Sequence, residues 1–202
     1  INSSNDPGSM LELAFDLCSN DLRKNEGTFY TPFYVAEKMV RQAFAIWQDK
    51  HSSYSDLCNI KILDPSCGAG EFLLASLHVL LEKHRLYTPE RSIEEILNHI
   101  VRTNLYGIDC NINALEILRR RLRQFSSSDS CDNIVQSDSL DHNEAGKCFA
   151  CGGKFDIVIG NPPYVSYGLR NTGKLDKLRA EKLRKRFAFS AQYKISLYAL
   201  FM

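Results

Sequence analysis

The chain has 202 residues, of which 44% are hydrophobic, and its 25 basic and 24 acidic side chains leave a formal net charge of +1. This composition predicts one globular domain with a sizeable core, and the lack of a long apolar run or an N-terminal signal pattern excludes a membrane partner. The seven cysteines are an odd number at irregular spacings, which favours a reducing cytoplasm over a disulfide framework.

The N-terminal region is predicted to lead into an amphipathic helix. Residues 1–9 are polar and predict a disordered leader, followed by a short helix over residues 10–22. After Pro32 apolar side chains recur at helical spacing, with Thr31 expected as the N-cap and Pro32 as the first helical residue. A helix N-terminus can bind a carboxylate, but a well-capped helix is the simpler interpretation of this stretch alone.

Residues 61–73 follow the pattern of a strand, a glycine turn and a helix. Gly68 and Gly70 allow a ligand to approach the backbone closely at the carboxyl end of the strand. The third glycine of the dinucleotide fingerprint and the Gly-Lys-Ser/Thr of a phosphate loop are both missing. Asp64 at the strand end instead suits a ligand with an amino-acid head, because its carboxylate can meet an ammonium group.

Two further predicted strands also lead to acidic residues. Residues 104–108 end at Asp109, a position from which a carboxylate commonly binds ribose hydroxyls. The helix that follows carries arginines predicted to form a solvated face, namely Arg119, Arg120, Arg121 and Arg123. Residues 133–136 form a third strand, and Asp138 beyond it can accept a hydrogen bond from an adenine amine.

The cysteines before the fourth strand allow a zinc site as an alternative. Cys148 and Cys151, with Cys131 and His142, supply four ligands of the types that zinc prefers. No second paired motif accompanies them, so a reduced loop is predicted and no metal is expected.

The stretch around the fourth strand carries the residues best suited to chemistry. Residues 155–159 predict a buried strand, and Pro162 and Pro163 end it. Because prolines have no N–H, Asn161 and the Pro162 carbonyl form two acceptors at a fixed separation, which suits a planar amine. Tyr164 offers a flat face for an unstacked base. The alternative is an ordinary strand end with a surface tyrosine.

The four predicted strands therefore converge chemically. Each ends in or leads to a polar side chain: Asp64, Asp109, Asp138 and Asn161. Because the carboxyl ends of parallel strands meet at one edge of a sheet, these groups are expected to lie together in an α/β fold.

The chain resembles the S-adenosylmethionine-dependent DNA adenine-N6 methyltransferases, best the modification portions of type I and type IIG restriction-modification enzymes. Five motifs of that family occur in order from residue 26 onward. Motif X resembles residues 27–32, motif I 64–70, motif II 106–109, motif III 136–138 and motif IV 161–164. The resemblance implies a Rossmann-like class I methyltransferase fold with a mainly parallel sheet.

The resemblance also implies roles for residues. Those expected to be catalytic, on an adenine flipped out of double-stranded DNA, are Asn161, Pro162, Pro163 and Tyr164.

For the cofactor S-adenosylmethionine, Phe29 and Thr31 would hold the methionine end. Asp109 would bind the ribose hydroxyls, and Asp138 with Ser139 the adenine ring. The other cofactor-binding residues implied by the motifs are Tyr30, Asp64, Cys67, Gly68, Gly70 and Phe72.

Other functions remain alternatives. Asn-Pro-Pro-Tyr also resembles enzymes that methylate planar amides, so a protein glutamine or RNA N-methyltransferase is one alternative, although residues 28–32 argue against it. The other is a non-catalytic module that keeps the fold only to bind partners.

By the resemblance, residues 10–202 are expected to be the N-terminal part of a catalytic domain, truncated after the fourth strand. A target-recognition domain is not expected within these residues, so a separate specificity domain or subunit is expected to read the DNA sequence. Between Leu169 and Phe187, eight basic residues stand against two acidic ones, a local net charge of +6. This segment is predicted to be either a solvated helix or a phosphate-contacting element.

Overall fold

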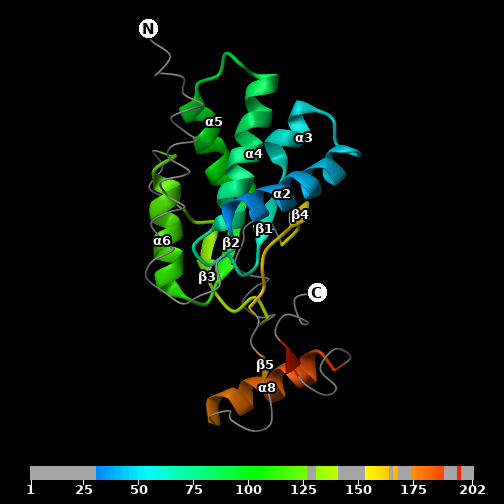
Figure 1. Cartoon of the computed structure of the whole chain (residues 1–202), viewed down its shortest axis with the longest axis vertical. Helices are drawn as coiled ribbons and strands as arrows, with labels where there is room; N and C mark the ends of the chain where they lie inside the picture. Colours follow the sequence, from blue (N-terminus) through cyan, green and yellow to red (C-terminus); the bar gives the residue numbers. More distant parts are fainter. Residues whose placement is uncertain are drawn as a thin grey trace.

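The computed structural model describes residues 31–126, 131–140, 153–163, 166–167, 174–188 and 195–196. The predicted leader and the helix over residues 10–22 lie outside these ranges. The elements in chain order (Figure 1) are α2 (Phe33–Gln48), α3 (Tyr54–Asn59), β1 (Ile62–Asp64), α4 (Glu71–Tyr87), α5 (Ile93–His99), a π-helical stretch (Ile100–Asn104), β2 (Leu105–Asp109), α6 (Ile112–Arg123), β3 (Ile134–Gln136), β4 (Ile157–Val158), β5 (Ser166–Tyr167), α8 (Lys174–Arg186) and β6 (Ile195–Ser196).

Four short strands form a parallel sheet in the order β3-β2-β1-β4. Leu63 of β1 lies opposite Tyr106 of β2 and Val158 of β4, and Ile108 of β2 lies opposite Val135 of β3. The carboxyl ends of the four strands therefore meet at one edge, as predicted. Beyond that edge β5 and β6 pair antiparallel beside α8, below the sheet in Figure 1.

Successive strand residues point to opposite faces of the sheet, and both faces are apolar. One face joins α2, α4, α5 and α6 in the main core, to which the strands contribute Ile62, Leu105, Ile134 and Ile157. The opposite face carries a second cluster made by Leu63, Tyr106 and Ile108. Burial on both faces, as in β1 and β2, is typical of a parallel sheet, and the predicted α/β fold is confirmed. The strand predicted to be buried over residues 155–159 is shorter, and its Val158 is 62% exposed because β4 is an edge strand of the described sheet.

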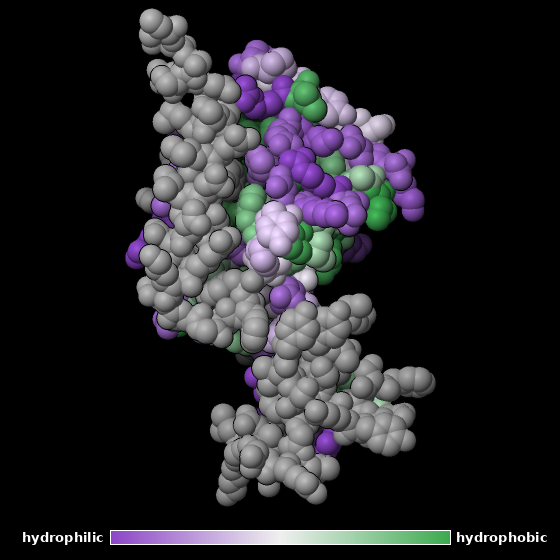
Figure 2. All heavy atoms as spheres, in the orientation of Figure 1, coloured by the Kyte–Doolittle hydropathy of each residue, from purple (hydrophilic) through white to green (hydrophobic). Residues whose placement is uncertain are grey.

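The central helix is α4, which is buried on most sides and packs against α2, β1 and β2. On the face shown in Figure 2, hydrophilic residues cover most of the described surface, with smaller apolar areas between them. None of the described helices is long and apolar enough to cross a membrane.

The start of α2 differs from the prediction. Its N-cap is Pro32, whose carbonyl accepts hydrogen bonds from the N–H groups of Val35 and Ala36, and no side chain caps the helix. Thr31 does not cap because its hydroxyl instead pairs with the Asn161 amide at the end of β4, at 3.2 Å. A tertiary contact has replaced the local one.

The predicted solvated arginine face of α6 is wrong at Arg121. This side chain is only 5% exposed and forms an ion pair with Glu71 of α4. Arg119 also turns inward and donates to the carbonyl of Ile134 at 2.7 Å, whereas Arg120 and Arg123 are exposed as predicted.

Helix α3 was not among the predicted elements. Its sequence signal is a capping box, in which Ser53 and Asp56 bond each other's backbone N–H groups at 3.0 and 3.1 Å.

Candidate active site

The glycine turn, residues 65–70, joins β1 to α4. Gly68 and Gly70 have φ values of 51° and 95°, in the left-handed region that glycine adopts without strain. A Cβ at Gly70 would overlap the Leu118 side chain of α6, whereas a Cβ at Gly68 would meet no atom of the described residues within 4 Å. The turn is therefore packed against α6 at Gly70 and open at Gly68.

Asp64 lies at the end of β1 and is 1% exposed. One carboxylate oxygen accepts the Ser66 N–H at 3.0 Å. Gly160 after β4 lies against the same carboxylate, so closely that a Cβ there would overlap Asp64 Oδ1. Burial, assisted by the charge of Asp109, raises the pKa of Asp64 to about 7. A cationic ligand would compensate this buried charge.

Asp109, at the end of β2, faces the same turn. Its Oδ2 accepts the Gly68 N–H and its Oδ1 accepts the Asn111 N–H, both at 2.8 Å. Each carboxylate oxygen has a second lone pair, so Asp109 can still accept hydrogen bonds from hydroxyl groups of a ligand.

Asn161 connects three parts of the predicted site. Its side-chain nitrogen donates to Thr31 Oγ1 at 3.2 Å, and its backbone carbonyl accepts the Ser66 hydroxyl at 3.3 Å. The amide nitrogen, a donor, is bonded to Thr31, and the amide oxygen is the acceptor that the side chain can offer to a substrate. Pro162 is half-buried and Pro163 exposed.

The residues after β3 are engaged by α8. Asp138 Oδ2 pairs with Arg179 at 2.8 Å, and Asp138 Oδ1 accepts the Leu140 N–H at 3.0 Å. The Ser139 hydroxyl donates to the Pro65 carbonyl of the glycine turn. Arg179 is a residue that sequence reasoning missed, since its only signal was the basic segment as a whole.

Two of the implied cofactor residues belong to the core. Phe72 is 3% exposed, and Cys67 is buried with its N–H donating to the Ile108 carbonyl at 2.9 Å. Burial raises the pKa of the Cys67 thiol well above its usual range, so the side chain stays a neutral thiol. Both side chains therefore pack into the core, Cys67 from within the turn and Phe72 from the first turn of α4. Phe29, Tyr30 and Tyr164 lie outside the described residues, and their roles stay predictions.

The zinc alternative stays untested, since His142, Cys148 and Cys151 lie outside the described residues and only Cys131 is within them.

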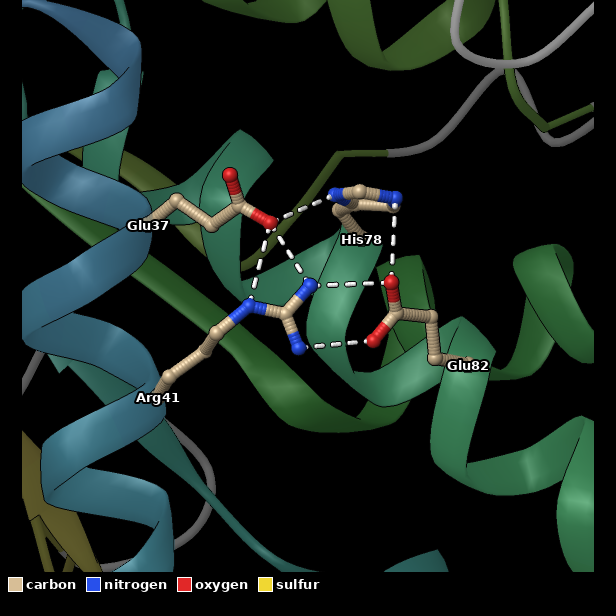
Figure 3. A network of polar contacts seen from close by, with 4 residues as sticks. All are labelled: Glu37, Arg41, His78 and Glu82. Atoms are coloured by element: carbon tan, nitrogen blue, oxygen red, sulfur yellow. Dashed lines mark hydrogen bonds and ion pairs between the residues drawn. The ribbon is translucent and has the colours of Figure 1, made fainter. Parts of the chain in front are cut away.

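A second group of metal-ligand types joins α2 to α4 (Figure 3). Glu37, His78 and Glu82 place their ligand atoms within 4.8 Å of one another. The guanidinium of Arg41 lies between the two carboxylates, 2.7 Å from each. Its hydrogen bonds to Glu82 raise the pKa of Arg41 further above its usual value. The positive charge of Arg41 already lies where a metal ion would sit. We therefore interpret this network as a set of ion pairs that joins α2 to α4, and not as a metal site.

Sequence comparisons match the chain to proteins of restriction-modification systems. Residues 103–202 match the family model described as Eco57I restriction-modification methylase. The type II methyltransferase M.BstVI of Geobacillus stearothermophilus is 33% identical over 153 residues, covering 68% of this chain and 24% of that protein. M.VspI of a Vibrio species is 27% identical over 158 residues, covering 78% and 30%. The chain thus spans less than a third of the length of these relatives.

A solved structure has the same fold at low identity. The DrdV–DNA complex, solved by cryoEM, matches 97% of this chain and 21% of its own, with a TM-score of 0.55 and 18% identity. At this identity the likeness concerns the fold alone.

Proposed function

Because the chain belongs to the restriction-modification methyltransferase family, we propose that its protein transfers a methyl group from S-adenosylmethionine to N6 of adenine in double-stranded DNA. The observation that carries this proposal is the pair of contacts made by Asn161. They join the corner after β4, residues 160–163, to Thr31 before α2 and to Ser66 in the glycine turn. Residues from three separate motifs thus meet at the carboxyl edge of the sheet.

The corner after β4 supports a reaction on a planar amine. Its acceptors are the Asn161 amide oxygen and the Pro162 carbonyl, and Pro162 and Pro163 have no N–H to compete with them. An adenine amine is a poor nucleophile because its lone pair is delocalised into the ring. When both N–H groups of the amine donate hydrogen bonds to these acceptors, the nitrogen becomes more tetrahedral and its lone pair points at the methyl donor. The acceleration of the reaction then comes from positioning of the amine.

The residues around the glycine turn fit S-adenosylmethionine. The buried Asp64 carboxylate suits the cofactor's ammonium, Asp109 has acceptor capacity for ribose hydroxyls, and the backbone at Gly68 is open to a ligand. By the resemblance, Asp138 and Ser139 would hold the adenine ring, although Asp138 is already paired with Arg179 and Ser139 with the Pro65 carbonyl. When bound, the cofactor supplies a methyl group on a sulfonium, which is the electrophile.

Double-stranded DNA is the proposed partner, with the target adenine flipped out and stacked on Tyr164. The basic helix α8 lies at the same edge of the sheet as the corner (Figure 1), where its charges would contact phosphates near the target. In this proposal the protein acts in the cytoplasm, and a further domain or subunit recognises the DNA sequence.

The test is Asn161→Ala in the full-length protein, assayed by transfer of labelled methyl groups to mixed-sequence duplexes and by identification of the methylated base. Removing one of two preorganised acceptors is expected to slow transfer by about 10²-fold or more. Cofactor affinity, measured by calorimetry, should change far less.

Asn113→Ala, which removes an exposed asparagine on α6, is the matched control and should methylate at the normal rate. A normal rate for Asn161→Ala would contradict the proposed mechanism. Methyl transfer to RNA or to glutamine amides, and not to DNA, would contradict the proposed substrate.

A further inference from the structure

The glycine turn is the most permissive stretch of backbone in the proposed cofactor site. Gly68 and Gly70 both lie in the left-handed region and flank Ala69. Glycines populate many backbone conformations, so a turn with two of them adopts one shape only if its surroundings impose it.

One continuous segment, from β2 through α6, contacts Gly68, Ala69 and Gly70. The Asp109 carboxylate accepts the Gly68 N–H, and the Leu118 side chain fills the space beside Gly70. Arg121, one helical turn beyond Leu118, donates to the Ala69 carbonyl at 2.8 Å. Each of Gly68, Ala69 and Gly70 therefore has its own restraint from this one segment of the chain.

The restraint from Arg121 is built on a buried ion pair. The same Nη1 that donates to Ala69 also donates to Glu71 Oε1 at 2.8 Å. Both side chains are nearly inaccessible, at 6% and 10% exposure. Glu71 stands next to Gly70 as the first residue of α4, so the pair clamps the turn between the two helices.

This ion pair is poorly suited to stabilising the fold. Burying two charges carries a desolvation penalty that the attraction between them often fails to offset. Within the described structure, Glu71 Oε2 and Arg121 Nε have no hydrogen-bond partner, which leaves part of that penalty uncompensated. Apolar residues of similar size would stabilise the fold about as well, but they cannot hold the Ala69 carbonyl.

We propose that Arg121 is a positioning residue of the cofactor site, which fixes the glycine turn in its ligand-binding shape through the Ala69 carbonyl. Arg121 is buried and acts through the Ala69 carbonyl instead of binding the ligand itself. With the Ala69 carbonyl held toward α6, the open side of Gly68 faces the cofactor. The inference deepens the proposed function, since it rests on this turn binding S-adenosylmethionine.

The test compares the full-length protein with the double variant Arg121→Met/Glu71→Met. Removing both charges avoids the unpaired buried carboxylate that Arg121→Met alone would leave, a change expected to be strongly destabilising. The melting temperature, hydrogen exchange at the amides of residues 67–70 and the affinity for S-adenosylmethionine are measured for each protein. Arg123→Met, which removes an exposed arginine from the same helix, is the control.

The double variant is expected to melt within a few degrees of the parent protein. Its turn amides should exchange at least about tenfold faster, and its affinity for S-adenosylmethionine should fall about tenfold. Arg121→Lys, which keeps a charged donor within reach of Ala69 and Glu71, should restore most of both properties. The control should match the parent in all three measurements.

Unchanged exchange in the turn, or unchanged affinity beside faster exchange, would overturn the inference. A large drop in melting temperature would also overturn it, because the ion pair would then serve the fold. If the parent protein itself does not bind S-adenosylmethionine, the proposed function fails, whereas the exchange measurement still reports whether Arg121 holds the turn.

Discussion

Asp109 has two functions at the level of a single side chain. Its oxygens accept the N–H groups of Gly68 and Asn111, so it supports the glycine turn before any ligand arrives. In the proposed site the same carboxylate also accepts the ribose hydroxyls. In the proposed site one residue would thus link the shape of the turn to recognition of the cofactor.

Replacing Asp109 should therefore weaken cofactor binding clearly. We expect Asp109→Ala to reduce the binding free energy of S-adenosylmethionine by about 1–3 kcal/mol, the scale of hydrogen bonds to a charged group. Calorimetry measures this, with Asp132→Ala as the control because Asp132 is an exposed carboxylate just before β3. Equal affinities for the two variants would move the ribose contact to another residue.

At the level of elements, α8 has two different faces. Arg179 and Arg186 bond Asp138 and the Leu140 carbonyl after β3, and Leu183 between them is buried. Lys182, Arg184, Lys185 and Arg186 are all exposed, but Arg186 is bonded to the Leu140 carbonyl, so the other three are the charges available to a partner. The helix is therefore neither wholly solvated nor wholly free to contact phosphates, since two of its arginines hold it to the sheet edge.

This division predicts which charges contribute to DNA binding. Replacing Lys182, Arg184 and Lys185 with Ala should flatten the salt dependence of binding by about 2–3 units of slope, because each phosphate contact contributes nearly one unit. The double variant Arg179→Ala/Arg186→Ala is the comparison and should change the slope by less than about 1 unit. Affinities measured over a series of salt concentrations supply both slopes. An unchanged slope in the triple variant would leave α8 as a solvated helix.

At the level of the whole molecule, the sheet edge carries a buried negative charge that costs stability. The pKa of Asp64 is raised to about 7 from its ordinary value of 3.8. Between these two pH values the folded state binds a proton that the unfolded state has released. The contribution of Asp64 to stability is therefore highest at low pH, decreases as pH rises toward 7, and is constant above that.

Asp64→Asn should remove this contribution. It keeps an acceptor for the Ser66 N–H, and the parent protein should lose roughly 2 kcal/mol relative to the variant between pH 5 and pH 7. Urea unfolding at several pH values measures the difference, with Asp132→Asn as the control for an exposed carboxylate. A constant difference between parent and variant would show that Asp64 does not titrate in this range. Saturating S-adenosylmethionine should reduce the loss if its ammonium meets the carboxylate.

Much of this architecture is determined by the sequence alone. Short apolar runs that end at Asp64, Asp109 and Asn161 predict parallel strands, and parallel strands place those ends at one edge. The glycines of the turn are a local signal, because they adopt left-handed backbone that strains most other residues, whereas the contacts that hold the turn in one shape come from β2 and α6. The order of the five motifs along the chain also indicated the methyltransferase family.

Only the tertiary structure decided which local signal prevailed. Thr31 has the sequence of an N-cap but pairs with Asn161, which is 130 residues away. Arg121 lies among arginines that predict a solvated face, yet it is buried because Glu71 and Ala69 supply its partners from another element. Asp138 meets Arg179 only because α8 returns to the sheet edge. Such pairings depend on positions brought together by folding, and periodicity along the chain reports only which side of its own element a residue faces.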